Sequence, residues 1–596
     1  MKFDNSLSYF KSQIEIADTK LQSLRKKDKR LAFLRLISFL AVIGLSVYFI
    51  SNSEMLVFSI MLFIALIAFG YLLKNHQFIR NTIQSITLLK EINQTEISRL
   101  KRKLSDIPGG DYFFNPKHPY HQDLDIFGKN SLYSLINRTT SKEGAELLAH
   151  RLSNGITDNS KITNTQEAIK ELAPRVDWRQ KFEVLGQSIE ENQIPDSESL
   201  KTEKISTFRK VIQIFLNLLL LSNIILVALD ITDVRLLILN IIVNIISTYT
   251  FISKTVKPAN DAIVFSTKLN KYKNIFRHIE SENFESELNK ELKTRLYSQS
   301  ISAGKSLEQL GSIGYWLENR GNQLYQIINA LFNIDLFIFI RLHRWFKNYR
   351  SHIPEWFQVM TEFEVLNSFA GFYYESESSY SFAEITEKQY CLEIKQAAHP
   401  LLKPGETVKN DFSMEGTGAI GLITGSNMSG KSTFLRTLGV NMVLAYCGAP
   451  VIAEKLVVSR MQIFTSMRTQ DSLTEHISAF YAELLRIKAL LDEIEKGQPV
   501  FYLLDEILKG TNSDDRVSGS LALIKQLIKL NAMGLIATHD LQLSALEKSL
   551  PEMGNYHFSS EVSGKSINFD YKLKEGPCES FNAKALMKNM GIQLED

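Results

Sequence analysis

The sequence is poor in cysteine and has almost no excess charge. Three cysteines, Cys391, Cys447 and Cys578, lie far apart in 596 residues. Their odd number and wide spacing exclude a disulfide framework and a cysteine-based metal site, and they favour a reducing, cytosol-facing compartment. Lysine and arginine number 68 against 65 acidic residues. This balance gives no global indication of nucleic-acid binding, although a local basic patch stays open.

Proline is also scarce, with 13 residues in the whole chain. The segments 75–205 and 255–390 instead carry Leu, Lys, Glu and Ile at helical spacing, which predicts helices. Pro108-Gly109-Gly110 predicts a break between a connecting helix and the next domain. The middle of the chain is therefore predicted to be an all-α helical core.

Long apolar runs are present, and they come in two pairs. Each is about 20 residues long, the length that crosses a bilayer as a helix. The pairs are 31–50 with 55–73, and 211–229 with 236–253. The short link within each pair allows only a tight helical turn, so the sequence predicts two transmembrane hairpins.

Positive charge predicts the orientation of these hairpins. Basic residues flank both pairs on the outside, whereas the two links carry only Arg235. By the positive-inside rule, both termini and the large segments face the cytoplasm of a multi-pass integral membrane protein. Burial as core helices stays open as the alternative. This alternative has more support for the second pair, because that pair carries the polar side chains Gln213, Asn217, Asn223, Asn240 and Asn244.

Two further stretches have an ordinary and a functional interpretation. Residues 327–340 are apolar but short and contain Asp335, so we expect a core helix rather than a span. The basic and aromatic run 341–350 suits nucleic acid or lipid headgroups, but the same pattern forms a solvated helix with packed stems. The ordinary interpretation is favoured.

A phosphate-binding loop is predicted near residue 425. The apolar strand 419–424 leads into Gly-x-x-x-x-Gly-Lys-Ser, and a helical pattern follows, which is the context that a P-loop needs. Its glycines turn backbone N–H groups toward phosphates, and the next helix adds its positive end. Lys431 would bridge the β- and γ-phosphates, and the Ser432 hydroxyl would bind Mg²⁺. The ATP-binding residues expected here are Gly425, Ser426, Asn427, Met428, Ser429, Gly430, Lys431, Ser432 and Thr433.

Two more strands end in polar residues that complete an ATPase site. The strand 499–504 runs into Asp505 and Glu506, and the strand 534–537 precedes His539. Asp505 would hold Mg²⁺, and Glu506 would activate the attacking water. His539 occupies the place of a switch residue that senses the γ-phosphate. The sequence thus predicts an ATP hydrolase with catalytic residues Glu506, His539 and Lys431.

With these elements in order, the sequence resembles the MutS family of ABC-type ATPases. The segment 424–433, TGSNMSGKST, is similar to the family's TG-x-NM-x-GKST, and 504–513, LDEILKGTNS, is similar to its DEIGRGTS segment. ATH at 537–539, the signature-like stretch 471–483 and His399-Pro400 add to the resemblance. Weaker similarity continues upstream over 110–205 and 255–390.

The resemblance implies a mechanism and a set of partners. In the family, two ATPase domains pair head to tail, so a homodimer is expected, with Ser478 reaching the partner's γ-phosphate. ATP and Mg²⁺ are the expected cofactors, and duplex DNA is an expected partner. The family's usual aromatic is Thr407 here, so adenine contacts are expected from Val408 and Tyr571. In place of the family's mismatch-reading domain stand a hairpin and a helix, which leaves mismatch recognition open.

The predicted fold is an α/β, P-loop, ABC-type ATPase domain preceded by an all-α core and two transmembrane hairpins. The expected segments are an N-terminal helix over 1–30, hairpin 31–73, connecting helix 74–109, core 110–205, hairpin 206–254, core 255–390 and ATPase domain 391–596. The predicted function is a membrane-anchored MutS-like ATPase that switches a helical body, with DNA mismatch repair implied by the resemblance. The alternatives are an ABC-type transporter and a nucleotide-gated membrane scaffold that binds no DNA.

Overall fold

The computed structural model describes residues 2–52, 55–189, 205–298, 301–375, 380–426, 428–468, 479–563 and 566–578. Two compact units emerge from the contacts between residues. One comprises 1–138, 145–180 and 365–596, and the other comprises 139–144 and 181–364. The predicted division into an α/β C-terminal part and a mostly helical remainder is confirmed.

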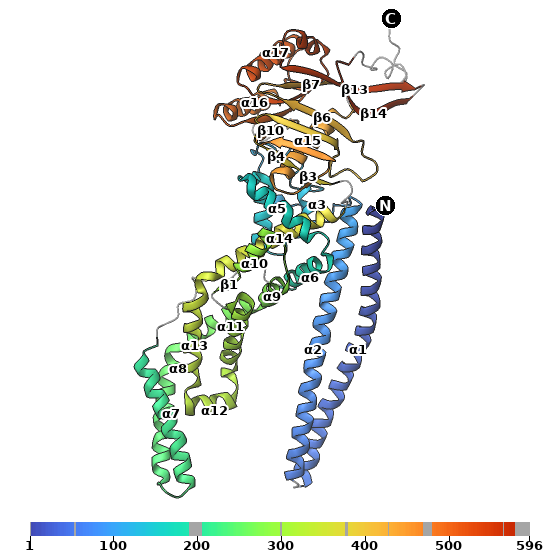
Figure 1. Ribbon diagram of the computed structural model, residues 1–596. Helices are drawn as coiled ribbons and strands as arrows, with labels where there is room; N and C mark the ends of the chain where they lie inside the picture. The colour runs from blue at the N-terminus through green and yellow to red at the C-terminus, as the bar shows by residue number, and fades with distance from the viewer. Residues whose placement is uncertain are drawn as a thin grey trace. The chain divides into compact units, whose positions relative to one another are not determined.

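The first unit begins with two long antiparallel helices (Figure 1), α1 (Lys2–Asn52) and α2 (Met55–Leu100). Each helix joins a polar half to an apolar half without a break, so α1 continues through the boundary expected at residue 30. The unit continues with the short helices α3 (Leu132–Ile136), α4 (Lys142–Asn154) and α5 (Asn159–Leu172), and α6 (Val176–Gln187) follows in the chain.

A buried cluster of charged residues closes the polar end of α2. Arg138 donates from Nε and Nη2 to the carboxylate of Glu96, at 2.9 and 2.7 Å, and from Nη2 to Glu375 Oε1 at 2.9 Å. Arg102 donates to Glu375 Oε2 at 3.0 Å and to the Pro400 carbonyl at 2.7 Å. Because Pro400 precedes the ATPase sheet, this cluster attaches the end of α2 to the α/β part.

The α/β part contains a six-stranded sheet with the order β10-β11-β12-β7-β13-β14. All neighbouring pairs are parallel except β13 with β14. The strands are β7 (Ile420–Thr424), β10 (Gln462–Ser466), β11 (Val500–Asp505), β12 (Met533–Thr538), β13 (Met553–Ser563) and β14 (Ser566–Glu575). The central strands are continuous apolar runs because both faces of the sheet are covered.

Helices lie on both faces of this sheet. Side chains of α16 (Ala479–Glu495) and α17 (Ser513–Lys529) pack with Tyr502 and Leu504 of β11 in one hydrophobic core. On the other face, a Cβ at Gly439 of α15 (Lys431–Tyr446) would come within 2.9 Å of Leu503. A second sheet, β4-β9-β5-β6, and the pair β3-β8 combine strands from before and after α15. They comprise β3 (Ser381–Phe382), β4 (Glu384–Thr386), β5 (Cys391–Ala397), β6 (Asn410–Glu415), β8 (Pro450–Val451) and β9 (Lys455–Ser459).

The second unit is helical apart from a two-residue strand pair, β1 (Tyr297–Ser298) and β2 (Ile301–Ser302). Its helices are α7 (Thr207–Ala228), α8 (Val234–Lys271), α9 (Lys273–Ser281), α10 (Glu287–Thr294), α11 (Ala303–Glu318), α12 (Gln323–Phe332) and α13 (Ile334–Tyr349), and α14 (Ile353–Glu375) follows. The amides of the α7–α8 hairpin bond between helices, since Gln213 Nε2 donates to Asn244 Oδ1 at 2.9 Å. Such bonds suit a membrane and a soluble core alike.

Four described helices are long and apolar enough to cross a membrane, by length and composition. They contain the apolar stretches of α1, α2, α7 and α8. If α12 and the helix that begins at Ile334 are counted together as one bent span, they form a fifth candidate span. In the basic and aromatic run of α13, Trp345, Phe346 and Tyr349 are buried, whereas Arg344 and Lys347 are exposed. The packed aromatic rings agree with the ordinary interpretation of that run.

Candidate nucleotide site

The parallel strands bring the predicted site residues to one edge of the sheet. Thr424 at the end of β7 pairs with Thr538 at the end of β12, and Asp505 at the end of β11 pairs with Ala537. The loop that follows β7 therefore meets Asp505-Glu506 and the residues after β12. The carboxyl edge of a parallel sheet is where α/β proteins bind ligands.

The loop between β7 and α15 depends on its two glycines. Gly425 and Gly430 have φ values of 149° and 110°, which residues with a Cβ rarely adopt. A Cβ on Gly425 would also lie 2.9 Å from the Phe558 carbonyl oxygen, and one on Gly430 would lie 3.2 Å from the Tyr571 ring. The glycines thus let the loop pass close to β13 and β14.

Lys431 folds back over this loop. Its Nζ donates to the carbonyls of Gly425 at 2.8 Å and Ser426 at 3.1 Å, and its side chain is buried. Burial lowers the pKa of Lys431, and the nearby carboxylates of Glu506 and Asp505 oppose that shift. The cation therefore sits at the N-terminal end of α15, where the helix dipole also favours an anion.

Ser432 and Asp505 meet directly below the loop. Ser432 Oγ donates to Asp505 Oδ2 at 2.5 Å. Asp505 Oδ1 is buried and has no hydrogen-bond partner among the described residues. Burial raises the pKa of Asp505, and the charge of Glu506 raises it further. An unsatisfied carboxylate oxygen beside a hydroxyl is the hard oxygen donor set that Mg²⁺ prefers, so these two residues fit the predicted ion.

Glu506 lies beside both a cation and a histidine. Its carboxylate is 2.9 Å from Lys509 Nζ and 3.8 Å from His539 Nδ1. Burial raises the pKa of Glu506, but the hydrogen bond and the charge of Lys509 outweigh that effect, so the net shift is downward. A low pKa keeps Glu506 as a carboxylate, the form that accepts a proton.

Supporting residues fix the segments that follow β11 and β12. The Glu483 carboxylate on α16 accepts from the backbone N–H groups of Leu508 and Lys509. Arg516 donates to both oxygens of Asp540, at 2.8 and 3.0 Å, and thereby ties the residue after His539 to α17. These contacts hold the peptide segments that carry Glu506 and His539.

A cavity of about 290 Å³ adjoins the glycine loop, and the predicted adenine contacts line it. Val408 and Tyr571 lie there together with Gly430, Thr433 and Phe434. Asn410 accepts from the Leu573 N–H at 2.9 Å and donates to the Tyr571 carbonyl at 3.0 Å, which fixes the position of Tyr571. The cavity therefore extends from the phosphate end of the site to the outer edge of the sheet.

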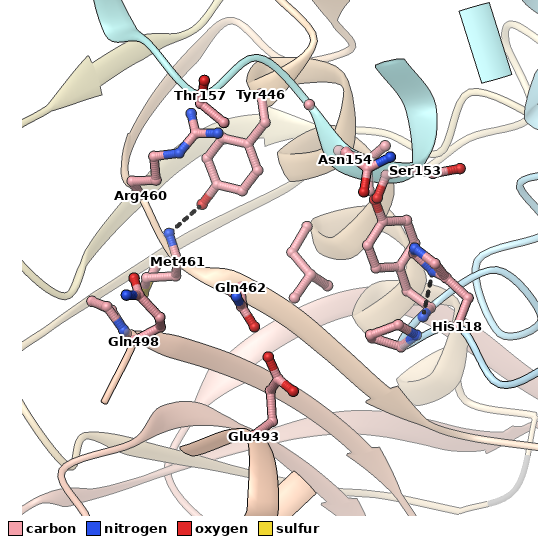
Figure 2. Close-up of a pocket in the computed structure, with 16 residues that line it drawn as sticks. His118, Ser153, Asn154, Thr157, Tyr446, Arg460, Met461, Gln462, Glu493 and Gln498 are labelled. Atoms are coloured by element: carbon pink, nitrogen blue, oxygen red, sulfur yellow. Dashed lines mark hydrogen bonds between the residues drawn. The ribbon is translucent and has the colours of Figure 1, made fainter. Parts of the chain in front are cut away.

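A larger cavity, of about 500 Å³, lies at the opposite edge of the same sheet. Figure 2 shows Arg460 and Tyr446 on one side of it and His118 on the other. It is lined by Gln462, which begins β10, and by Pro499, which precedes β11. Since the P-loop and Asp505 lie at the other ends of these strands, this cavity is no part of the candidate nucleotide site.

Two predicted site residues, Asn427 and Ser478, lie outside the described residues. Met428 is described and exposed, with a positive φ of 70°. The remaining predicted residues from the P-loop, β11, β12 and β14 are gathered at one site. Their roles in binding and catalysis remain predictions.

Comparison with known proteins identifies this C-terminal region. Residues 421–590 match the family model of MutS domain V. The C-terminal part of the chain therefore belongs to the MutS family. The DNA mismatch repair protein MutS of Thermotoga petrophila is 33% identical over 216 residues, which are 36% of this chain and 27% of that protein. MutS of Halalkalibacterium halodurans is 29% identical over 262 residues, 42% of this chain and 30% of that protein.

The similarity to MutS covers only part of each protein. MutS of Aquifex pyrophilus is 33% identical over 211 residues, 35% of this chain and 24% of that protein. The chain thus spans less than a third of the length of these curated relatives. MutS domain V is the ATPase domain of the family. The match begins in β7 and includes the P-loop, Asp505-Glu506, His539 and Tyr571, whereas Val408 precedes it.

Three residues around the candidate nucleotide site have structural roles that the sequence pattern does not predict. They are Glu483, which holds the segment after β11, Asn410, which holds Tyr571, and Arg516, which holds Asp540. Glu483 would have been recognisable as a carboxylate on a predicted helix, but its backbone partners lie 25 and 26 residues away. Arg516 and Asp540 carry no local signal, because only the pairing of strands brings them together.

Proposed function

We propose that this chain is a membrane-anchored ATPase of the MutS family that binds ATP with Mg²⁺ and hydrolyses it. The juxtaposition of Lys431, Ser432 and Asp505 at the carboxyl edge of the sheet carries this proposal. It supplies a cation, a hydroxyl and an unsatisfied carboxylate oxygen within one buried cluster. The MutS domain V match favours this family over an ABC-type transporter.

Each residue has a defined task in the proposed reaction. Lys431 leaves the loop carbonyls and binds the β- and γ-phosphate oxygens, while Ser432 and Asp505 hold the metal ion. Mg²⁺, when bound, supplies charge neutralisation of the phosphates. Glu506 orients and deprotonates the attacking water. His539, 3.8 Å from Glu506, reports the presence of the γ-phosphate to the segment after β12.

Replacing Lys431 by Ala should lower kcat for ATP hydrolysis by about 100-fold or more, because a preorganised cation at the phosphates is lost. The measurement is the steady-state ATPase rate of the detergent-solubilised protein. Lys525→Ala, an exposed lysine on α17, is the matched control and should leave the rate unchanged. Persistent hydrolysis in the purified Lys431→Ala protein would remove the P-loop assignment.

The membrane anchor is proposed to consist of the α1–α2 and α7–α8 hairpins. Their apolar halves expose residues such as Phe63 and Phe215 to the surroundings, which soluble helices avoid over such lengths. Basic residues flank the hairpins on the side of the large segments, which supports a cytoplasmic location of the ATPase domain.

A homodimer and duplex DNA are the proposed partners. A second copy would complete the nucleotide site through Ser478, and ATP binding would close the pair and switch the helical body. The curated relatives are named DNA mismatch repair proteins, which makes duplex DNA the first ligand to test.

Duplex DNA should raise the ATPase rate, and the affinity for DNA should fall at least about tenfold between 50 and 200 mM salt. A fall of that size corresponds to roughly two or more phosphate contacts. The measurement is the ATPase rate with homoduplex and mismatched DNA, together with a salt series of binding isotherms. A flat response to both duplexes would exclude the repair role and favour a scaffold that binds no DNA.

A further inference from the structure

Helix α12 presents an apolar face to its surroundings. Leu324, Ile327 and Ile328 are 70%, 59% and 46% exposed, and their spacing of three and four residues puts them on one side of the helix. In a helix that faces water, that side carries polar residues.

The opposite side of α12 is polar and buried. The Tyr325 hydroxyl donates to Asp335 Oδ1 at 2.6 Å, and Asn329 Oδ1 accepts from the Asp335 N–H at 2.9 Å. Arg320 donates to Asp335 Oδ2 from Nε and Nη2, at 2.8 and 2.6 Å. The helix is therefore polar inside and apolar outside. This is the arrangement found where lipid replaces water, because polar groups in an apolar medium must find partners within the protein.

The contacts of α12 with α8 define its depth. Arg320 Nη2, just before α12, donates to Thr255 Oγ1 at 3.1 Å. Near the other end of α12, Thr248 Oγ1 donates to the Asn329 carbonyl at 3.2 Å. Seven residues of helix separate Thr248 from Thr255, which is about 10 Å along α8. Lys254, next to Thr255, is where the basic flank of the hairpin begins, so α12 descends from that flank into the apolar zone.

A contact with α7, the other helix of the hairpin, also indicates the depth of α12 in the membrane. Phe332 is the last residue of α12, and its carbonyl oxygen accepts a hydrogen bond from Asn217 Nδ2 at 2.9 Å. Asn217 lies 11 residues before the end of α7, about 16 Å from the far end of the hairpin. At this distance Asn217 lies well inside a hydrocarbon layer that is about 30 Å thick. The end of α12 thus lies within the layer and not at its surface.

The chain then turns back. Asn333 adopts a left-handed conformation with φ 49° and ψ 52°, and its Nδ2 donates to Gln213 Oε1 at 3.1 Å. The axis bends by 85° between α12 and the helix that begins at Ile334, and α13 leads to the exposed cations Arg344 and Lys347. Figure 1 shows α12 lying crosswise at the lower ends of α11 and α13.

We propose that α12 is a re-entrant membrane helix whose apolar face, Leu324-Ile327-Ile328, contacts the acyl chains of the cytoplasmic leaflet about 10 Å below the basic flank. This inference rests on the proposed membrane location of the α7–α8 hairpin. The occupant of the face is lipid because that face continues the exposed apolar surface of α7 and α8, to which α12 is hydrogen-bonded.

The test is a spin label at Ile328→Cys in protein reconstituted in phosphatidylcholine vesicles. The background is Cys391→Ser with Cys578→Ser. Cys447 can be retained because it is buried and burial raises the pKa of its thiol to about 12, which keeps it unreactive. Collision rates with oxygen, which concentrates in lipid, and with a water-soluble nickel chelate give the depth of the label. Leu218→Cys on exposed α7 is the membrane reference, and Lys347→Cys on α13 is the aqueous reference.

The quantity compared is the ratio of the collision rate with oxygen to the collision rate with the nickel chelate. We expect this ratio at Ile328→Cys to match the ratio at Leu218→Cys. It should exceed the ratio at Lys347→Cys at least about fivefold. A label at Leu324→Cys, on the same face, gives an independent measurement if the first variant does not fold. If Leu218→Cys is shielded from nickel but both α12 labels match Lys347→Cys, the re-entrant helix is wrong and the membrane anchor stands. If Leu218→Cys also matches Lys347→Cys, the membrane location of the α7–α8 hairpin is wrong as well.

Discussion

Replacing Glu506 by Gln should lower kcat for ATP hydrolysis by about 10²- to 10⁴-fold while ATP still binds. The amide keeps the size of the side chain but cannot take a proton from the attacking water, and general base catalysis contributes about that factor. Lys431, Ser432 and Asp505 are untouched, so ATP affinity should stay within about a few fold. ATP that binds without turnover should also hold two copies together, which light scattering on a size-exclusion column would detect.

The matched control for this prediction is Glu495→Gln, an exposed carboxylate near the end of α16. It should change neither the hydrolysis rate nor the oligomeric state. If Glu506→Gln hydrolyses ATP at the normal rate, Glu506 is not the base. If it loses hydrolysis but stays monomeric with ATP, the composite dimer site is wrong while the ATPase assignment stands.

Replacing Arg138 by Met should destabilise the part of the protein around the end of α2 by about 3–5 kcal/mol. That is the usual cost of removing one partner from a buried ion pair, because the remaining charges stay buried without compensation. Here the carboxylates of Glu96 and Glu375 would both lose the guanidinium that they share. The measurement is the thermal midpoint of detergent-solubilised protein, compared with Arg277→Met, which removes an exposed pair with Glu308 and should have little effect.

The effect of Arg138→Met should depend on pH. Burial raises the pKa of Glu96, but the charges of Arg138 and Arg99 outweigh burial and lower that pKa to about 2. A lowered pKa stabilises the folded protein above the pKa of the unfolded chain, about 4.3, and this stabilisation is lost as the pH falls toward 2. The gap between wild type and variant should therefore narrow below about pH 4. A gap that stays constant down to pH 3 would assign the loss to packing instead of charge.

The fold class and the place of the nucleotide site could be predicted because their signals are local. Gly425 to Ser432 follow an apolar strand, and Asp505 follows another, so each motif carries its own structural context. The rule that carboxyl ends of parallel strands share one edge then gathers these motifs, and the register of β7, β11 and β12 agrees with it.

The buried charges and the α12 helix could not be predicted because their signals are spread along the chain. Glu96, Arg138 and Glu375 come from three segments, and each alone resembles a surface residue of a helical pattern. The segment 327–340 was expected to be one core helix, whereas α12 ends at Phe332 and the chain turns at Asn333 before α13. Asp335 lowered the apparent hydropathy of the segment, although its charge is satisfied by Arg320 in the fold.

The buried charge cluster at the end of α2 has a practical consequence for removing the first hairpin from this protein. A cut that removes the first hairpin together with all of α2, which ends at Leu100, would strip Glu96 and Arg99 from the buried cluster. Arg138 would then lose the carboxylate that it binds through both Nε and Nη2. A cut within α2 upstream of Asn93, whose side chain is buried against Gln180, would keep these contacts. The natural place to divide this protein therefore lies inside a helix and not at the end of one.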